Sequence, residues 1–272
     1  MDLHSGPADL AQTRARATLT LHREIHGAGE PFVLLNGIMM TTASWALQLP
    51  ALVPHFRCIL HDFKGQLRSP SDEPSWTIES HADDLRDLLD GLDLDRVHVA
   101  GTSYGGEVGM IFAYMYPERV KSLTVIASTS RADDRMKRGA AGARDLALRE
   151  PERLFDAVAP SFYSPEFIAA HPELIEQGRA RLATFPRSFF EGYAKLCDAF
   201  GALDITKNLQ GITCPALVIA AERDTLKPLA CSRTIAENIG GARLEIVADA
   251  GHAVVIEKPQ DVNRLVSSFL RC

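Results

Sequence analysis

Short apolar runs recur along the chain and alternate with stretches that have the periodicity of amphipathic helices. The runs are continuous and rich in Val, Ile and Leu, which is typical of strands buried on both faces of a sheet. They occupy residues 31–37, 57–62, 96–101, 120–128, 215–224 and 243–249. Residues 17–27 alternate instead and predict one or two early strands. Because strands that alternate with helices require right-handed crossovers, the pattern predicts an α/β fold with a mostly parallel sheet.

Two helices are expected in the first half of the chain. One covers residues 43–55, and another follows Ser80, which begins an S-x-x-D pattern like that of a capping box. Between Arg131 and Asp204 the pattern changes, because the segments there are helical and no β-branched run interrupts them. We therefore expect a core made of residues 1–130 and 206–272. Residues 131–205 would form an inserted helical lid over the carboxyl edge of the strands, where such folds bind ligands.

Composition and charge narrow the function. A net charge of −6 argues against a nucleic-acid partner, because phosphate binding needs a basic surface. The sequence has no H-x-H or H-E-x-x-H pattern and no phosphate-binding glycine loop, so we expect neither a metal nor another cofactor. It also lacks an apolar run of about 18 residues and a signal-peptide core, which predicts a cytoplasmic protein with no membrane span. The oligomeric state is not predicted.

A candidate nucleophile lies where a predicted strand runs directly into a predicted helix. Gly101-Thr102-Ser103-Tyr104-Gly105 matches G-x-S-x-G, with Gly106 following. This spacing is needed because Ser103 must lie at the apex of a turn too tight for side chains at positions minus two and plus two. The alternative is a glycine-rich packing turn with a bystander serine.

A serine nucleophile needs a base, and His252 is the favoured candidate among nine histidines. It follows the last predicted strand in Ala250-Gly251-His252, a loop at the carboxyl edge of the sheet. Most of the other histidines lie in predicted strands, helices or the N-terminal tail. His61, which ends a strand, is the one serious rival.

A carboxylate must then hold the base in the correct tautomer. Asp224 ends the strand LVIAAERD and is presented at the same edge. Glu222, two residues earlier, is an alternative, whereas Asp249 lies too close to His252 in sequence to suit the geometry. The chain order Ser, Asp, His is the order expected of one particular hydrolase fold.

These features resemble the α/β-hydrolase superfamily from about Thr18 to Leu270, especially its small serine esterases, enol-lactonases and non-haem haloperoxidase-like members. The resemblance implies an eight-stranded sheet and an oxyanion hole made by the backbone amides of Ile38 and Tyr104. It also places Asn36, Gly37 and Met39 beside the substrate. The loop after residues 57–62 departs from the family pattern D-x-R-G-x-G-x-S. It has Lys64 in place of the arginine and Leu67 in place of the second glycine.

The expected reaction is hydrolysis of a carboxylic ester, thioester or lactone of a small to medium-sized, largely apolar substrate through an acyl-enzyme. The loop Asn36–Ser44 also resembles that of members that transfer 3-hydroxyacyl groups, so an acyltransferase with the same triad is an alternative. A hydrolase-like ligand-binding or signalling protein is another. About half of the aromatic residues lie in the predicted lid, where they line an acyl pocket or pack the lid onto the core.

Overall fold

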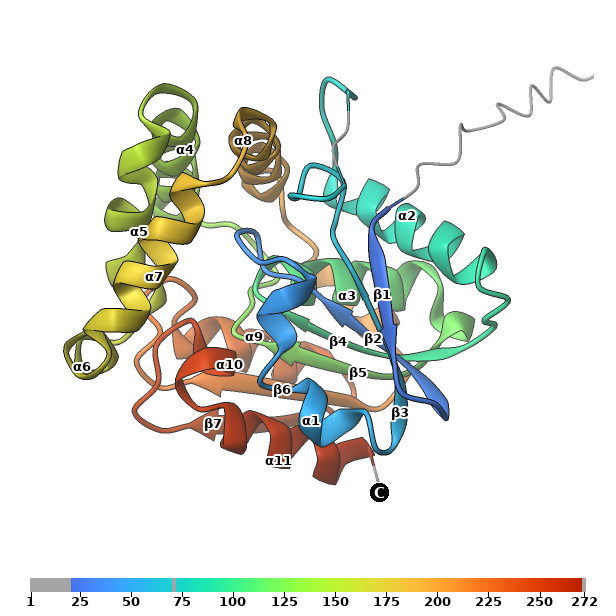
Figure 1. Cartoon of the computed structure of the whole chain (residues 1–272). Helices are drawn as coiled ribbons and strands as arrows, with labels where there is room; N and C mark the ends of the chain where they lie inside the picture. Colours follow the sequence, from blue (N-terminus) through green and yellow to red (C-terminus); the bar gives the residue numbers. More distant parts are fainter. Residues whose placement is uncertain (1–20, 70–71, 271–272) are drawn as a thin grey trace, which may run out of the picture.

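The computed structural model describes residues 21–69 and 72–270, which form an open, twisted sheet flanked by helices (Figure 1). The sheet has seven strands in the order β1-β3-β2-β4-β5-β6-β7. The strand at one edge, β1, pairs antiparallel with β3, and all other neighbours are parallel. The strands are β1 (Arg23–His26), β2 (Glu30–Leu35), β3 (Phe56–His61), β4 (Val97–Thr102), β5 (Val120–Ile126), β6 (Ala216–Ala221) and β7 (Arg243–Val247).

Each face of the sheet buries its own hydrophobic core. Successive residues of β2 alternate between the two, because Val33 and Leu35 join one cluster whereas Phe32 and Leu34 join the other. The first cluster includes α2 (Ile78–Asp90), α3 (Tyr104–Met115) and α9 (Leu229–Asn238). The second includes α1 (Leu49–Leu52), α10 (Val254–Glu257) and α11 (Pro259–Leu270). The described chain is therefore a three-layer α/β structure.

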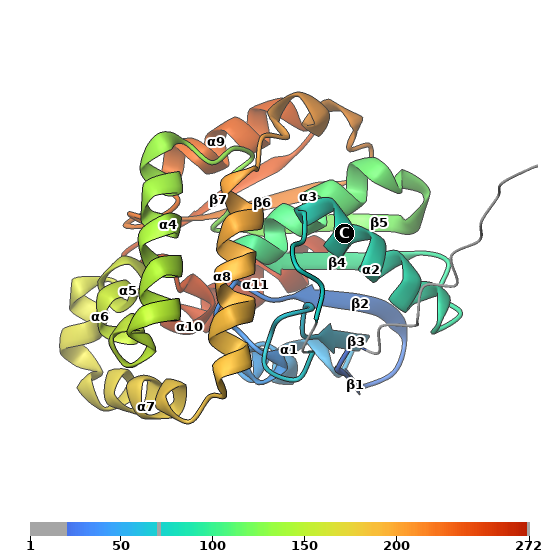
Figure 2. The same cartoon turned by 90° about the horizontal axis from the view of Figure 1, so that it is seen from above.

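Five helices between β5 and β6 lie together beyond the carboxyl ends of the strands (Figure 1; Figure 2). They are α4 (Asp134–Arg149), α5 (Leu154–Phe162), α6 (Pro165–Ala170), α7 (Pro172–Ala183) and α8 (Arg187–Gly201). They have a hydrophobic cluster of their own, which includes Leu154, Phe189 and Tyr193. Short 3₁₀ helices occupy Thr42–Trp45, Pro117–Arg119, Pro151–Arg153 and Thr206–Gly211.

The two ends of this helical segment are joined by a short antiparallel bridge between Arg131 and Asp204. The backbone amide of Ala132 donates to Leu203, and that of Ile205 donates to Ser130, both over 2.9 Å. Because these bonds close the insertion at its base, the segment leaves and rejoins the core at one point.

The α/β class with a mostly parallel sheet is confirmed, with three local differences. The described residues contain seven strands rather than eight. Of the one or two strands expected over residues 17–27, the described chain contains β1, and residues 17–20 lie outside it. The helix expected over 43–55 is a 3₁₀ turn followed by the short α1, because Pro50 has no amide to donate within a continuous helix. Helix α2 begins earlier than expected, since Thr77 rather than Ser80 caps it.

Two histidines are buried in the first core. His61 and His81 have no exposed surface, and burial lowers the pKa of His61 from 6.5 to about 4 and that of His81 well below its usual value. Both therefore stay neutral in the folded chain at pH values at which the unfolded chain protonates them. Their contribution to stability is lost as the pH falls below about 6.5.

We expect His61→Phe to weaken this acid sensitivity. Between neutral pH and about pH 5, the wild-type protein should lose about 2 kcal/mol of unfolding free energy through His61, and the variant should not. The pKa of Asp62 is raised by burial and acts in the opposite direction, so the comparison of variants isolates the histidine.

Urea unfolding at the two pH values measures this difference, with the exposed His55→Phe as the matched control. An equal loss of stability on acidification in His61→Phe and wild type would contradict the assignment.

Candidate active site

The turn at Ser103 joins β4 to α3 and holds the serine in an unusual backbone conformation. Ser103 has φ 53° and ψ −120°, a region that residues with a side chain rarely adopt. Its amide donates to the carbonyl of Ile126 over 2.8 Å, and the Ser128 hydroxyl donates to its carbonyl over 2.8 Å. These contacts from the adjacent strand β5 hold the strained turn and leave the side chain half-buried at the sheet edge.

The glycines around Ser103 are required by close backbone approach. A Cβ at Gly101 would lie 2.2 Å from the carbonyl oxygen of Gly105, and one at Gly105 would lie 2.1 Å from that of Leu35. A Cβ at Gly106 would lie 2.1 Å from the Ser128 hydroxyl. The G-x-S-x-G-G pattern is therefore explained by steric contacts within the sheet edge, as the spacing predicted.

Three loops at the carboxyl ends of different strands bring Ser103, His252 and Asp224 together. Nε2 of His252 lies 2.9 Å from the Ser103 hydroxyl, and Nδ1 lies 2.7 Å from Oδ2 of Asp224. With the ring proton on Nδ1, His252 donates to the carboxylate and accepts from the serine. His252 is 7% exposed and Asp224 is 5% exposed, so the chain of hydrogen bonds is screened from solvent except at the serine.

Backbone amides complete the hydrogen bonding of the Asp224 carboxylate. Its Oδ1 accepts from the amides of Leu226 and Lys227, each over 2.8 Å, which leaves Oδ2 directed at His252. The carboxylate is thus held in one orientation by the turn that follows β6.

The rival residues lie elsewhere. His61 is enclosed in β3, where its Nδ1 lies 3.4 Å from the Asp62 carbonyl. Glu222 is exposed and accepts from the amide of Asp249, whereas Asp249 pairs with Arg223. Among the described hydrogen bonds, none joins these residues to Ser103.

The expected oxyanion residues flank the serine. Ile38 and Tyr104 both line the space beside Ser103, and Tyr104 opens helix α3, where the first amides have no partner within the helix. Gln66 holds the loop that carries Ile38, because its Nε2 donates to the carbonyl of Gly37 over 2.8 Å and to that of Ile38 over 3.4 Å. Sequence reasoning missed Gln66, since it is not a glycine or an acid of the family pattern.

Asn36, which was expected beside the substrate, has polar partners within the protein. Asn36 is fully buried, and its amide donates to the His61 carbonyl, to Asp62 and to Gln66, while its oxygen accepts from Trp45. Its hydrogen-bonding capacity is used within the protein, so it stabilises the loop, and it is not among the residues that line the two cavities at Ser103. Gly37 and Met39 do line one cavity.

A second residue that the sequence did not single out, Glu257, ties the His252 loop to the helical segment. Its carboxylate accepts from the amides of Gly251 and Ser164, each over 3.0 Å, and from the Ser164 hydroxyl over 2.7 Å. The amide of Ala253 also donates to the carbonyl of Phe162 over 2.7 Å. These contacts couple the position of the base to helices α5 and α6.

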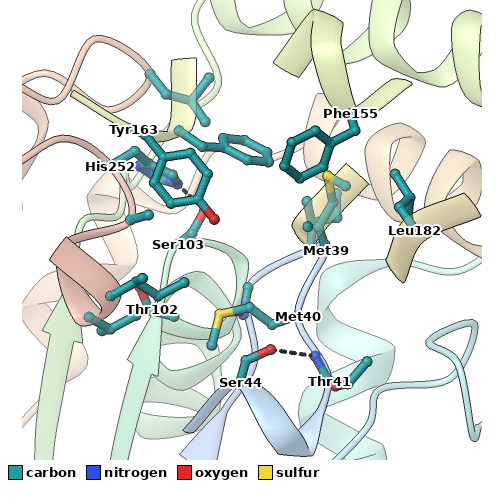
Figure 3. Close-up of a pocket in the computed structure, with 18 of the residues that line it drawn as sticks. Met39, Met40, Thr41, Ser44, Thr102, Ser103, Phe155, Tyr163, Leu182 and His252 are labelled. Atoms are coloured by element: carbon teal, nitrogen blue, oxygen red, sulfur yellow. Dashed lines mark hydrogen bonds between the residues drawn. The ribbon is translucent and has the colours of Figure 1, made fainter. Parts of the chain in front are cut away.

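Two cavities meet at Ser103. The first, of about 300 Å³, is bounded by the loop after β2, by the His252 loop and by α5 and α7 (Figure 3). Figure 3 shows Tyr163 beside Ser103 and His252, with Met39, Phe155 and Leu182 across the cavity. The second, of about 370 Å³, lies between α3 and helices α4, α5 and α8. Both cavities are lined by Ile38, Ser103, Phe162 and Leu226.

The described residues contain neither a metal-binding cluster nor a membrane-spanning helix. Within residues 21–69 and 72–270, no three His, Cys, Asp or Glu side chains gather in a way that would hold a metal ion. In the same part of the chain, no helix combines the length and apolar character that crossing a membrane requires.

Comparison with known proteins agrees with this geometry. The family model described as alpha/beta hydrolase fold matches residues 30–259. The chain therefore belongs to the alpha/beta hydrolase fold family, and it is a hydrolase of that family. The putative carbamate hydrolase RutD of Azorhizobium caulinodans is 32% identical over 268 residues, which are 98% of this chain and 96% of that protein.

Solved structures show the same relationship. The enol-lactonase from Burkholderia xenovorans LB400 superimposes with a TM-score of 0.86 at 29% identity, covering 93% of this chain and 96% of that one. A thermophilic esterase from Thermogutta terrifontis has a TM-score of 0.84 at 28% identity, covering 92% and 93%. The predicted family is confirmed.

The close contact between Gly105 and the backbone of β2 predicts that a side chain at this position destabilises the fold. Gly105→Ala should lower the free energy of unfolding by about 3 kcal/mol or more, because its Cβ would press on the rigid backbone of β2. Gly142→Ala is the control, since no heavy atom lies within 4 Å of its Cβ position in α4, and it should stabilise by about 0.5–1 kcal/mol. Urea unfolding of both variants checks the contrast, and comparable stabilities would refute it.

Proposed function

We propose that the protein hydrolyses carboxylic esters, thioesters or lactones of small, largely apolar molecules through an acyl-enzyme at Ser103. The observation that carries this proposal is the unbroken hydrogen-bonded chain from Ser103 through His252 to Asp224, which opens into two cavities at the serine. A serine so connected to a base and a buried carboxylate has the arrangement required for nucleophilic catalysis.

The steps follow from the positions of these groups. The Ser103 oxygen attacks the substrate carbonyl while Nε2 of His252 takes the hydroxyl proton. The imidazolium then gives that proton to the leaving oxygen or sulfur as its bond to the carbonyl carbon breaks. Asp224 keeps the ring oriented and stabilises its positive charge. A water molecule, deprotonated by the same imidazole, cleaves the acyl-enzyme and restores the serine.

The negative charge on the carbonyl oxygen needs fixed donors. We assign this role to the backbone amides of Ile38 and Tyr104, which flank Ser103 from the loop after β2 and from the first turn of α3. Each such donor typically contributes about 3 kcal/mol to the transition state. Gln66 supports the first of them by holding the carbonyls of Gly37 and Ile38.

The cavity walls favour an apolar substrate. Methionine and aromatic side chains from the loop after β2 and from α5 and α7 dominate the first cavity, among them Met39, Met40, Phe155 and Phe185. Such walls suit hydrocarbon groups of an ester or lactone, as the names of the similar enol-lactonase and esterase also suggest. Because the similar protein RutD is named a putative carbamate hydrolase, tests of the proposal should include a carbamate as a comparison substrate.

Activity on p-nitrophenyl esters of increasing acyl length tests the proposal. We expect Ser103→Ala to lower kcat/KM by about 10⁴-fold or more, because the triad acts as a unit. The control is Ser188→Ala, at an exposed serine of α8. Turnover in Ser103→Ala that matches the wild type would exclude the acyl-enzyme. An N-alkyl carbamate of the same phenol, cleaved faster than every ester, would move the assignment to carbamates.

The orientation of Asp224 makes Asp224→Asn a sharp probe of the tautomer. The amide oxygen of the variant can still accept from Leu226 and Lys227, so the loop should remain in place. Its NH₂ group would instead face Nδ1 of His252 and force the ring proton onto Nε2, where the ring can no longer accept from Ser103. We expect kcat to fall by about 10⁴-fold with little change in melting temperature. A variant with near wild-type kcat would exclude this role.

A further inference from the structure

The two cavities that meet at Ser103 suit two different parts of a substrate. His252 lines the first cavity and is absent from the wall of the second. On the proposed function, the imidazole must give its proton to the leaving group, so the leaving group lies on the side of His252. The acyl part then extends into the second cavity, the one between α3 and helices α4, α5 and α8.

Most of the second cavity suits a hydrocarbon chain. Its wall includes the apolar side chains of Met136, Leu146, Val158 and Phe200. Gly139 and Gly142 on α4 leave space for a ligand because neither carries a side chain. Three charged side chains also line this cavity: Arg138 is exposed, whereas Glu107 and Lys227 are buried.

Glu107 and Lys227 form a buried ion pair beside the nucleophile. Nζ of Lys227 lies 2.7 Å from Oε1 of Glu107, and the two side chains are 4% and 1% exposed, respectively. The same Nζ lies 3.6 Å from the ring centroid of Phe200. Glu107 is on α3, and its amide donates to the Ser103 carbonyl, so it lies one helical turn from the nucleophile.

The pair is incompletely satisfied. Among the described residues, Oε2 of Glu107 is buried and has no hydrogen-bond partner. A buried carboxylate oxygen without a donor is costly, because the protein replaces none of the water that it lost. The ammonium of Lys227 has three N–H donors, of which the described contacts use one on Glu107. Both residues line the second cavity, so an acceptor and a donor lie side by side in its wall.

The chemistry of the pair selects among ligands. The two charges of the pair are hydrogen-bonded to each other, so a charged ligand group would be close to both. A carboxylate would be attracted by Lys227 and repelled by Glu107, whereas an ammonium would be attracted by Glu107 and repelled by Lys227. A hydroxyl can accept from the ammonium and donate to the free carboxylate oxygen at once. We propose that the second cavity binds the acyl part of the substrate and that the Glu107–Lys227 pair recognises a hydroxyl group on it.

The position of the pair limits where that hydroxyl lies. The Glu107 amide donates to the Ser103 carbonyl over 3.1 Å, so Glu107 begins within the first turn of α3, next to the residue that attacks the substrate carbonyl. We therefore expect the hydroxyl within a few carbons of the reacting carbonyl and not at the end of a long chain.

The Glu107–Lys227 pair also has a structural role, and the test must distinguish that role from recognition of a hydroxyl. The amide of Lys227 donates to Oδ1 of Asp224, so the pair links the loop of the acid to the helix of the nucleophile. Loss of that link would lower activity on every ester by the same factor. Recognition of a hydroxyl would instead change the ratio between hydroxylated and plain substrates.

The first measurement uses the wild-type protein. It compares kcat/KM for p-nitrophenyl hexanoate with that for hexanoate esters carrying one hydroxyl at each successive carbon, and with a carboxylate-bearing analogue of the same length. We expect one hydroxylated ester to exceed the plain ester by about 10- to 100-fold, and the carboxylate to be disfavoured. The absence of any hydroxyl preference, or a preference for the carboxylate, would overturn the proposal.

The second measurement uses Glu107→Leu/Lys227→Met, which removes both charges together and leaves no unpaired ion in the core. We expect the ratio of hydroxylated to plain ester to fall to about 1. The control is Asp261→Leu/Arg264→Met, which removes the exposed ion pair on α11 and should keep the wild-type ratio. A ratio unchanged in the Glu107/Lys227 variant would overturn the proposal and leave the pair a purely structural link.

Failure of the proposed function gives a different result. In that case no ester of the series would show turnover that depends on Ser103, and both proposals would fall together. Turnover that depends on Ser103 but ignores the hydroxyl would overturn only the recognition by Glu107 and Lys227.

Discussion

The backbone of Ser103, held at a positive φ between two strands and a helix, is the constraint on which the site depends. The turn is possible because the residues on either side of it are glycines. A Cβ at Gly101 or Gly105 would lie about 2 Å from a backbone carbonyl oxygen. The strain is held by hydrogen bonds to β5, which are themselves part of the parallel sheet. The serine therefore points outward only as long as the central strands are packed.

Around this turn, single side chains tie separate loops to one another. Gln66 holds the loop with Ile38, Glu257 joins the His252 loop to Ser164, and Lys227 links the Asp224 loop to α3 through Glu107. Each of these side chains has at least one partner far away in the chain. The relative positions of nucleophile, base and acid are thus maintained by several independent contacts, as a reactive geometry demands.

The burial of charge near the site has a consistent pattern. Lys64 is 1% exposed and pairs with Asp84 over 3.0 Å, and Lys227 pairs with Glu107 over 2.7 Å. Removing one partner would leave a charge in an apolar interior, which costs more than replacing both. The two pairs differ in their surroundings, because the Glu107–Lys227 pair borders a cavity and has an unoccupied acceptor.

The sequence by itself determined the α/β class, six of the strands to within a few residues, and the loops that carry Ser103, Asp224 and His252. These features are local, since a continuous apolar run or a glycine-flanked serine is visible within a few positions. Only the tertiary structure decided that Asn36 is buried and hydrogen-bonded to Asp62, and that Gln66, Glu257 and the Glu107–Lys227 pair border the site. Their partners lie 26 or more residues away in most cases, and up to 120, so no local pattern of residues predicts which side chains will meet.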